Sequence, residues 1–518
     1  MGTHDEQAYR FFSGTPVRCL KAKRAGGKLD SVLQAIYTHH QKSVVCDYDA
    51  GHGMRGVTAF VGGIDFTHGR YDTALHPLFG SIGPGGPHEN DFYSCISDLK
   101  KETGPRQPWH DIHCRVEGLA AADAMTNFEE RWAKVCEGSK TKSPSQLYNQ
   151  GRGLGPRFVE SSPGFGGVTP PSDPESWTCQ VFRSIDSRSA NFGRAAGLRR
   201  KRGRGVDDSI HEAYVYHIRR AKRFIYIENQ YFLGSSHAWH RDRMKEASHM
   251  VCIELALKIC SKIDRHEPFA AYCVIPLFPE GNPASDSMQT VLCWQRNTME
   301  MMYSMIWKAI ERNNSPARPT DYLNFYCLGQ REPFHPGVPP PVPEGGREST
   351  TAGRVLSSRR FMIYVHSKLM IVDDEYALVG SANINMRSMA GTRDSELAVG
   401  CFQKAHTDEG GRRPHGQVYG FRMSLWAEHL GKRISDAFQR PETPGCVRLM
   451  NAIARKNWKA YSGDVAQPME GHLMVFPIEI SHEGGVVLHG DYGPTYPDFP
   501  FALVEGRKSN TLPLILTT

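Results

Sequence analysis

A short pattern of one histidine, one lysine and one aspartate occurs twice in this chain, at widely separated places. The copies are His40, Lys42 and Asp47, and His366, Lys368 and Asp373. In both, the histidine and lysine are two residues apart, so on an extended strand their side chains leave the same face. A single His-x-Lys is common and usually marks a buried strand with an incidental histidine. Its recurrence at the same spacing indicates an internal repeat, and hence two similar half-domains that share one site.

Each copy is predicted to form two short buried strands followed by a turn of small residues. In the second copy the strands cover residues 361–372 and 376–379, and Gly380-Ser381-Ala382-Asn383 follows. In the first copy the second strand covers residues 59–64, and Gly62-Gly63-Ile64-Asp65 is the corresponding turn. The two aspartates of the pattern lie on the opposite strand parity from the histidines, so we expect supporting roles for them.

An imidazole beside an ammonium group suits a phosphate. The lysine supplies charge to the phosphoryl oxygens, and the histidine supplies a nucleophile or a proton. A carboxylate at the other ring nitrogen would fix the tautomer. Glu396 is the candidate partner for His366, and Asp72 is the candidate for His40.

The repeated H-x-K-x4-D, followed each time by G-[GS]-x-[DN], resembles the phospholipase D superfamily. Four stretches resemble its plant-type, calcium-dependent members, and the likeness runs from Thr3 to Thr518. These stretches are residues 62–72 (GGIDFTHGRYD), 106–117 (RQPWHDIHCRVE), 224–236 (FIYIENQYFLGSS) and 512–518 (LPLILTT). The resemblance implies hydrolysis of phosphatidylcholine-type lipids to phosphatidic acid through a phosphohistidine. It favours His40 as nucleophile and His366 as acid, although the reverse assignment stays open.

The same resemblance implies further site residues. Gln230 corresponds to a residue that contacts phosphatidate, and Ser381, Asn383 and Asp65 would lie around the phosphate. Positions that bind Ca²⁺ in the family correspond to His76, His110 and Glu428. Because calcium prefers oxygen ligands, backbone carbonyls are the alternative donors at the two histidines.

The expected fold is α/β: two phospholipase D-like half-domains related by a pseudo-twofold axis, with mixed sheets flanked by helices. We assign residues 1–205 to the first half-domain, 206–430 to the second and 431–518 to a C-terminal cap. Plant-type relatives carry a C2 domain and part of the first half before the match begins. We therefore expect an incomplete first sheet with an open edge. The alternatives are a weak or inactive lipid-binding relative and a nucleic-acid phosphodiesterase of the same superfamily.

Composition narrows the partners. The formal net charge of +7 favours an anionic surface, either a membrane or a nucleic acid. The resemblance favours the membrane, with no nucleic acid and a monomeric protein. One basic run is either a solvated loop or a contact with phosphoinositides: Arg199, Arg200, Lys201 and Arg202. No apolar run approaches a membrane span, and the N-terminus does not read as a signal peptide. Thirteen scattered cysteines indicate reduced thiols. These features predict a cytoplasmic protein that associates peripherally with membranes.

Overall fold

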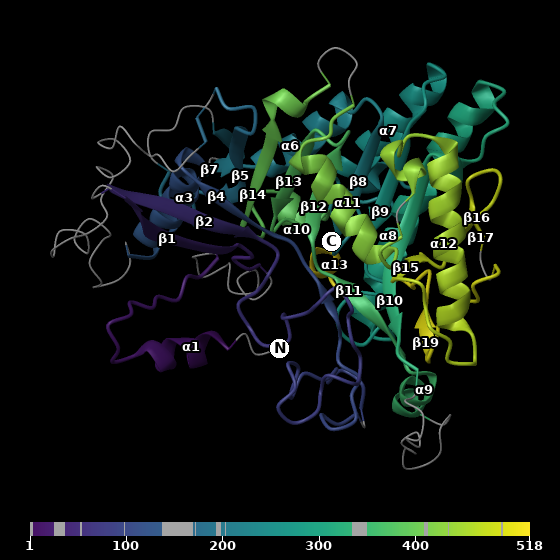
Figure 1. Ribbon diagram of the computed structural model, residues 1–518, viewed down its shortest axis with the longest axis horizontal. Coiled ribbons are helices and arrows are strands. Elements are labelled where there is room, and N and C mark those ends of the chain that lie inside the picture. The colour runs from purple at the N-terminus through teal and green to yellow at the C-terminus, as the bar shows by residue number, and fades with distance from the viewer. Residues whose placement is uncertain are drawn as a thin grey trace.

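One large mixed β-sheet runs through the molecule, with helices packed around it (Figure 1). The computed structural model describes residues 4–24, 37–51, 54–97, 99–136, 169–170, 172–192, 198–201, 204–333, 350–408, 413–433, 435–487 and 490–518. Within these ranges the sheet has twelve strands in the order β3-β11-β10-β9-β8-β12-β13-β14-β5-β7-β6, and β15 pairs with β10. This architecture confirms the expected α/β class with a mixed sheet flanked by helices.

The strands of the large sheet are β3 (Trp109–His110), β5 (Trp177–Asp186), β6 (Arg199–Lys201), β7 (Arg204–Asp207), β8 (Phe224–Asn229), β9 (Ala270–Val274), β10 (Leu323–Arg331), β11 (Arg360–Val365), β12 (Lys368–Val372), β13 (Tyr376–Gly380), β14 (Glu396–Gln403) and β15 (Leu473–Val475). The helices are α1 (Asp5–Phe12), α3 (Leu119–Cys136), α6 (Ser209–Arg220), α7 (Val251–Asp264), α8 (Asp286–Arg312), α9 (Thr351–Ser358), α10 (Met386–Met389), α11 (Gln417–His429), α12 (Pro444–Ser462) and α13 (Leu514–Thr517). Two small hairpins pair β16 (Glu479–Ile480) with β17 (Val486–Val487), and β18 (Thr495–Tyr496) with β19 (Phe499–Leu503).

The centre of the large sheet is parallel and fully covered. Strands β8, β9 and β10 run parallel, and every residue of β8 and β9 is buried. Their near-continuous apolar sequences are typical of strands with helices on both faces. Helix α8, predicted at residues 288–310, buries most of its methionines and aromatic residues. Its core-packing interpretation therefore accounts for this composition.

The apolar run at residues 361–372 is two strands rather than the one that we predicted. Strand β10 is long: its first half pairs with β9, and its second half pairs with β11. The chain leaves β11 at Val365 and enters the sheet again at Lys368, where β12 pairs with β8. Because the run is apolar throughout, its composition gives no sign of the break. The break places His366 at the sheet edge where β8 ends.

A separate antiparallel sheet, in the order β1-β2-β4, carries the first copy of the repeated pattern. Its strands are β1 (Lys42–Gly51), β2 (Met54–Gly62) and β4 (His113–Glu117). Apolar side chains of β2, including Val57 and Val61, pack against Leu397 and Val399 of β14. The connection between β2 and β3 lies beneath the large sheet in Figure 1. Among the described residues β1 pairs with β2 alone.

The large sheet draws strands from all three predicted segments. Strand β5 lies before residue 205 but pairs with β14, and β15 lies after residue 430 but pairs with β10. Strand pairing therefore crosses both predicted domain boundaries, at residues 205 and 430. The division of the chain into three domains stays a prediction. None of the helices in the described ranges is both long and apolar enough to span a bilayer.

Candidate active site

Each histidine of the repeated pattern lies against a backbone segment from the other half of the chain. The amide of His40 donates to the carbonyl of Ser395 at 2.9 Å. The amide of His366 donates to the carbonyl of His110 at 2.8 Å. The two contacts are equivalent. In each, the backbone of a histidine from one copy binds the backbone of the residues that precede a strand of the other half, β14 for His40 and β4 for His366. Both histidines are therefore held by the partner half.

A carboxylate follows each of these two acceptor carbonyls and contacts the histidine ring. Nδ1 of His40 lies 3.0 Å from Oε2 of Glu396, and Nδ1 of His366 lies 2.6 Å from Oδ2 of Asp111. A carboxylate at Nδ1 holds the proton on that nitrogen and leaves Nε2 available for a reacting atom. The two rings thus have matching orientation and chemistry.

These contacts show that the predicted carboxylate partners were wrong. Glu396 orients His40 rather than His366, and Asp72 contacts neither ring of the repeated pattern. Instead Asp72 accepts hydrogen bonds from the Arg106 guanidinium and the Trp109 amide, and contacts Nδ1 of His76 at 3.0 Å.

The residue that the prediction missed is Asp111. Glu396 begins β14, which pairs with the second strand of its own copy, and Asp111 stands just before β4, which pairs with β2. The available sequence signal was therefore a carboxylate at or shortly before the start of the third strand of each copy. In the first copy a long Gly/Pro-rich connection separates that strand from the pattern, and Asp72 lies within this connection.

The two lysines are buried and make parallel contacts. Lys42 donates to the carbonyl of His40 at 2.9 Å and lies 3.4 Å from Oδ1 of Asp65. Lys368 donates to the carbonyl of His366 and, at 2.9 Å, to Oε1 of Gln230. Gln230 follows directly after β8, at the carboxyl end where ligand-contacting groups gather in α/β sheets.

The turn of small residues after each copy packs against the other copy. The carbonyl of Ser381 lies 3.1 Å from Nδ1 of His40, and its hydroxyl donates to Glu396 at 2.6 Å. A Cβ atom at Gly63 would lie 2.1 Å from Oδ1 of Asp111 and 3.1 Å from the carbonyl of His366, so only glycine fits there. The close approach of the Asp111 carboxylate and of the His366 carbonyl therefore explains why glycine stands in this turn.

The buried side chain of Asn383 has a further feature. Its Oδ1 has no hydrogen-bond partner in the part of the chain that the structure describes. It lies in the same turn as Ser381, whose carbonyl faces the His40 ring.

Charges from both copies act on the same groups. Burial would raise the pKa of Asp65, but Lys42, His366 and His40 outweigh it and lower that pKa. Burial lowers the pKa of Lys368 to about 7, and the positive charge of Lys42 contributes to this shift. Burial, with Lys368 next in importance, lowers the pKa of His366 to about 3. The His366 ring is thus neutral at pH 7, and the excess of buried cations favours an anion in the site.

The two aspartates of the pattern do not contact the histidine-lysine pairs. Asp373 accepts hydrogen bonds from the amides of Lys222, Arg223 and Phe224 at 2.6 to 2.9 Å, and so fixes the start of β8. Asp47 is partly exposed and pairs with Arg55 on the neighbouring strand. Residues 222–224 donate their amides to Asp373. Among the described residues, no backbone segment makes the equivalent contact with Asp47.

An aromatic and cationic layer covers His366. The ring of Trp109 lies 4.8 Å from the His366 ring, and the guanidinium of Arg70 lies 3.6 Å above Trp109. Both residues line a cavity of about 680 Å³. Neither residue stands out as a site residue in the sequence, since their contact joins two loops that composition does not relate.

The three predicted calcium residues lie together. Oε1 of Glu428 is 3.1 Å from Nε2 of His76 and 3.1 Å from Nδ1 of His110. The remaining nitrogens face carboxylates too, Asp72 at 3.0 Å and Glu228 at 2.7 Å. Burial opposes charge on His110, but Glu228 and Glu428 prevail and raise its pKa well above the usual value. Both rings therefore face a carboxylate at each nitrogen, and Glu428 is the carboxylate that contacts both of them.

The side chains of the basic run that we predicted to contact phosphoinositides lie outside what the structure describes. Arg199, Arg200 and Lys201 form the backbone of β6, their side chains lie outside what the structure describes, and Arg202 lies outside the described residues altogether.

Comparison with known proteins gives a consistent picture. The family model described as "Phospholipase D" matches residues 1–506. "Phospholipase D alpha 1" of Oryza sativa subsp. japonica is 45% identical over 543 residues, covering 100% of this chain and 64% of that protein. The protein of the same name in Zea mays is 46% identical, with the same coverage. "Phospholipase D beta 2" of Arabidopsis thaliana is 43% identical over 94% of this chain and 54% of its own length. The chain thus spans less than two thirds of the length of these relatives.

Proposed function

Because the chain belongs to the phospholipase D family, we propose that it hydrolyses phosphatidylcholine-type glycerophospholipids to phosphatidic acid and the free headgroup. The observation that carries this proposal is the reciprocal arrangement of His40 with Glu396 and His366 with Asp111. Each pair supplies an imidazole with its Nδ1 occupied, next to a buried lysine. Two such groups suit attack on phosphorus and protonation of the leaving oxygen.

In the first step Nε2 of His40 attacks phosphorus, and the bond from phosphorus to the headgroup oxygen breaks. His366 gives its Nε2 proton to that oxygen, and the headgroup leaves as an alcohol. In the second step water attacks the phosphohistidine while His366 takes the proton of the water, so phosphatidic acid is released and both rings return to their starting state. Lys42, Lys368 and Asn383 hold the phosphoryl oxygens as charge develops.

The low pKa of His366 sets a condition on this assignment. An acid has to carry a proton when the leaving group departs, whereas the free His366 ring is neutral at pH 7. The phosphodiester carries one negative charge, and its binding offsets the lysine charge that disfavours the imidazolium. We therefore infer that His366 takes up its proton together with the substrate. Trapping the phosphohistidine and locating it by mass spectrometry tests the roles, which are reversed if the phosphate is found on His366.

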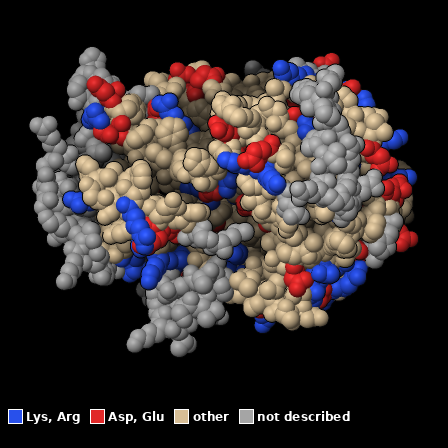
Figure 2. All heavy atoms as spheres, turned by 90° about the horizontal axis from the view of Figure 1, so that it is seen from below, with Lys and Arg blue, Asp and Glu red and all other residues tan. Residues whose placement is uncertain are grey.

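The charge pattern on one face of the molecule supports a lipid substrate over a nucleic acid. On the face shown in Figure 2, basic and acidic side chains of the described residues are interspersed around a central hollow that contains Lys and Arg atoms. Duplex binding relies on a patch or stripe of one sign. Parallel assays with phosphatidylcholine and with single- and double-stranded DNA distinguish the two substrate classes.

We propose a calcium requirement on the same family grounds. Glu428 would hold the ion together with His76 and His110, because the ligand atoms of these three residues lie within 4.8 Å of one another, and the bound ion would tie α11 to β3 and to the loop at residue 76. Calcium should then raise the thermal midpoint of the wild type, but not that of Glu428→Gln. Equal shifts in both proteins would refute this assignment. We further propose that the protein acts at a membrane surface as a peripheral monomer.

Single substitutions test the proposed reaction. His40→Ala and His366→Ala should each abolish choline release from phosphatidylcholine, because neither ring can replace the other. Asp47→Ala is the matched control, since this surface residue belongs to the same pattern but touches neither ring. Near wild-type release by either histidine variant would refute the two-histidine mechanism.

A further inference from the structure

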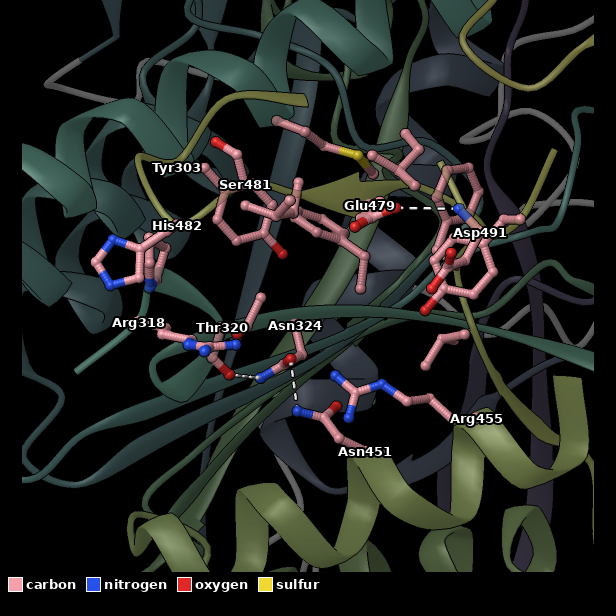
Figure 3. A pocket seen from close by; sticks show the side chains of 18 residues that line it. Tyr303, Arg318, Thr320, Asn324, Asn451, Arg455, Glu479, Ser481, His482 and Asp491 are labelled. Carbon is pink, nitrogen blue, oxygen red and sulfur yellow. Dashed lines mark hydrogen bonds between the residues drawn. The ribbon is translucent and has the colours of Figure 1, made fainter. Parts of the chain in front are cut away.

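A second polar cavity, of about 240 Å³, lies far from the two histidines (Figure 3). It is formed around Asn324 at the start of β10, the short helix η2 (Pro319–Asp321) and helix α12. Strands β8, β9 and β10 are parallel, and the starts of β8 and β10 are aligned through Ala270 and Ala271 of β9. Since Lys368 pairs with Asn229 at the end of β8, this cavity lies at the opposite edge of the sheet from the candidate active site.

The floor of this headgroup cavity, as we call it, is a pair of amide side chains with fixed orientation. Nδ2 of Asn451 donates to Oδ1 of Asn324 at 2.9 Å, and Nδ2 of Asn324 donates to the carbonyl of Thr320 at 2.9 Å. The hydroxyl of Tyr326 donates to Oδ1 of Asn451 at 2.8 Å. An amide nitrogen carries two protons, so each asparagine keeps one N–H beyond these bonds.

Two guanidinium groups flank this floor. Figure 3 shows Arg318 and Arg455 on either side of the two amides, with their nitrogens toward them. Neither guanidinium has a carboxylate partner within 4.0 Å among the residues that the structure describes. Arginine and amide N–H groups that converge without a carboxylate form a cradle for a phosphate, which arginine binds through two oxygens.

The other side of the headgroup cavity has the opposite character. Glu479 and Asp491 line it there, and Oε2 of Glu479 accepts the amide of Asp491 at 3.0 Å (Figure 3). The aromatic side chains of Tyr303 and Tyr492 line the same cavity. Carboxylates and aromatic rings together attract an organic ammonium group.

We propose that the headgroup cavity binds a small phosphate ester that carries an ammonium group, with the phosphate at Arg318 and Arg455 and the ammonium at Glu479. The volume is below the range for drug-sized ligands, so a polar headgroup fits and an acyl chain does not. A soluble ester such as phosphocholine and the headgroup of a phospholipid share this chemistry.

Calorimetric titration with phosphocholine tests the site. The double variant Arg318→Gln/Arg455→Gln should lose about tenfold to hundredfold in affinity, because two charged donors disappear. Arg448→Gln is the matched control: it removes an exposed arginine of the same helix that does not line the cavity. Both proteins should retain wild-type thermal midpoints and wild-type hydrolysis of a monomeric, short-chain phosphatidylcholine that requires no vesicle binding, which shows that the fold and the candidate active site are intact. Equal affinity in the wild type and the double variant, or no binding below about 10 mM, overturns the proposal.

Two further arms define the ligand. Glu479→Gln should weaken phosphocholine about tenfold and leave inorganic phosphate unchanged; if inorganic phosphate binds the wild type as tightly as phosphocholine, the ammonium half of the proposal is wrong. Pelleting with phosphatidylcholine vesicles identifies the source. Reduced pelleting of the double variant supports a lipid headgroup as the ligand, and unchanged pelleting together with lost phosphocholine binding supports a free ester.

Discussion

Replacing Asp111 with asparagine tests the crossed arrangement of the two halves most sharply. In the wild type Oδ2 of Asp111 faces Nδ1 of His366 at 2.6 Å and Nε1 of Trp109 at 3.1 Å, and Oδ1 accepts the amide of Ile112 at 2.9 Å. An asparagine has to keep its one oxygen toward Ile112 or toward the two rings. With oxygen toward Ile112, its NH₂ faces Nδ1 and forces the proton of His366 onto Nε2.

The expected effect follows from these contacts. Loss of a charged hydrogen bond costs about 1.5–3 kcal/mol, which corresponds to about 10- to 150-fold in rate. The wrong tautomer adds to this loss, and the comparable substitution in the serine-protease triad costs about 10⁴-fold. We therefore expect kcat for choline release to fall by about 10²- to 10⁴-fold, while KM changes by less than about threefold, because the substituted group does not touch the lipid.

Asp72→Asn is the matched control, since the sequence alone favoured Asp72 as a histidine partner. Asp72 contacts Arg106 and His76, so we expect this variant to lower the thermal midpoint and to change kcat by less than about tenfold. The reasoning is refuted if Asp111→Asn keeps kcat within about threefold of wild type while Asp72→Asn loses activity a hundredfold.

Three more measurements address the electrostatics of the fold and the site. Burial lowers the pKa of Lys368 to about 7, so the dissociation constant of a phosphodiester analogue should rise toward tenfold per unit above about pH 7; a constant value from pH 6 to 9 would contradict this. Asp373→Asn should lower the free energy of unfolding by about 1–3 kcal/mol, because an NH₂ group replaces an acceptor of backbone amides, whereas Asp47→Asn should change it by less than about 1 kcal/mol. Arg422→Met leaves Asp374 buried and unpaired and should cost about 3–5 kcal/mol in urea unfolding; a loss below about 1 kcal/mol would show that the pair contributes little.

The parts of the fold that local sequence could predict are those with a strong local pattern. The apolar run ending in Glu228-Asn229-Gln230 forms β8, and the small-residue turn with Ser381 follows β13 as expected. The repeat itself placed His40 and His366 in equivalent positions, because equal spacing implies equal local structure.

The contacts between the halves could not be predicted in the same way. Glu396 was assigned to the histidine of its own half, whereas the structure pairs it with His40. Which half supplies the carboxylate depends on how the small sheet packs against β14, and this packing leaves no mark on the spacing of the motif. The break between β11 and β12 is hidden for a similar reason, since it appears only in the pairing of β11 with β10 and of β12 with β8.

The position of bound orthovanadate, a phosphate analogue, tests the central claim most directly. We predict one vanadate per chain, within hydrogen-bond distance of both Lys42 and Lys368, with Nε2 of His40 and Nε2 of His366 on opposite sides of the vanadium. Two vanadate ions, each held by a single half of the molecule, would contradict the shared site.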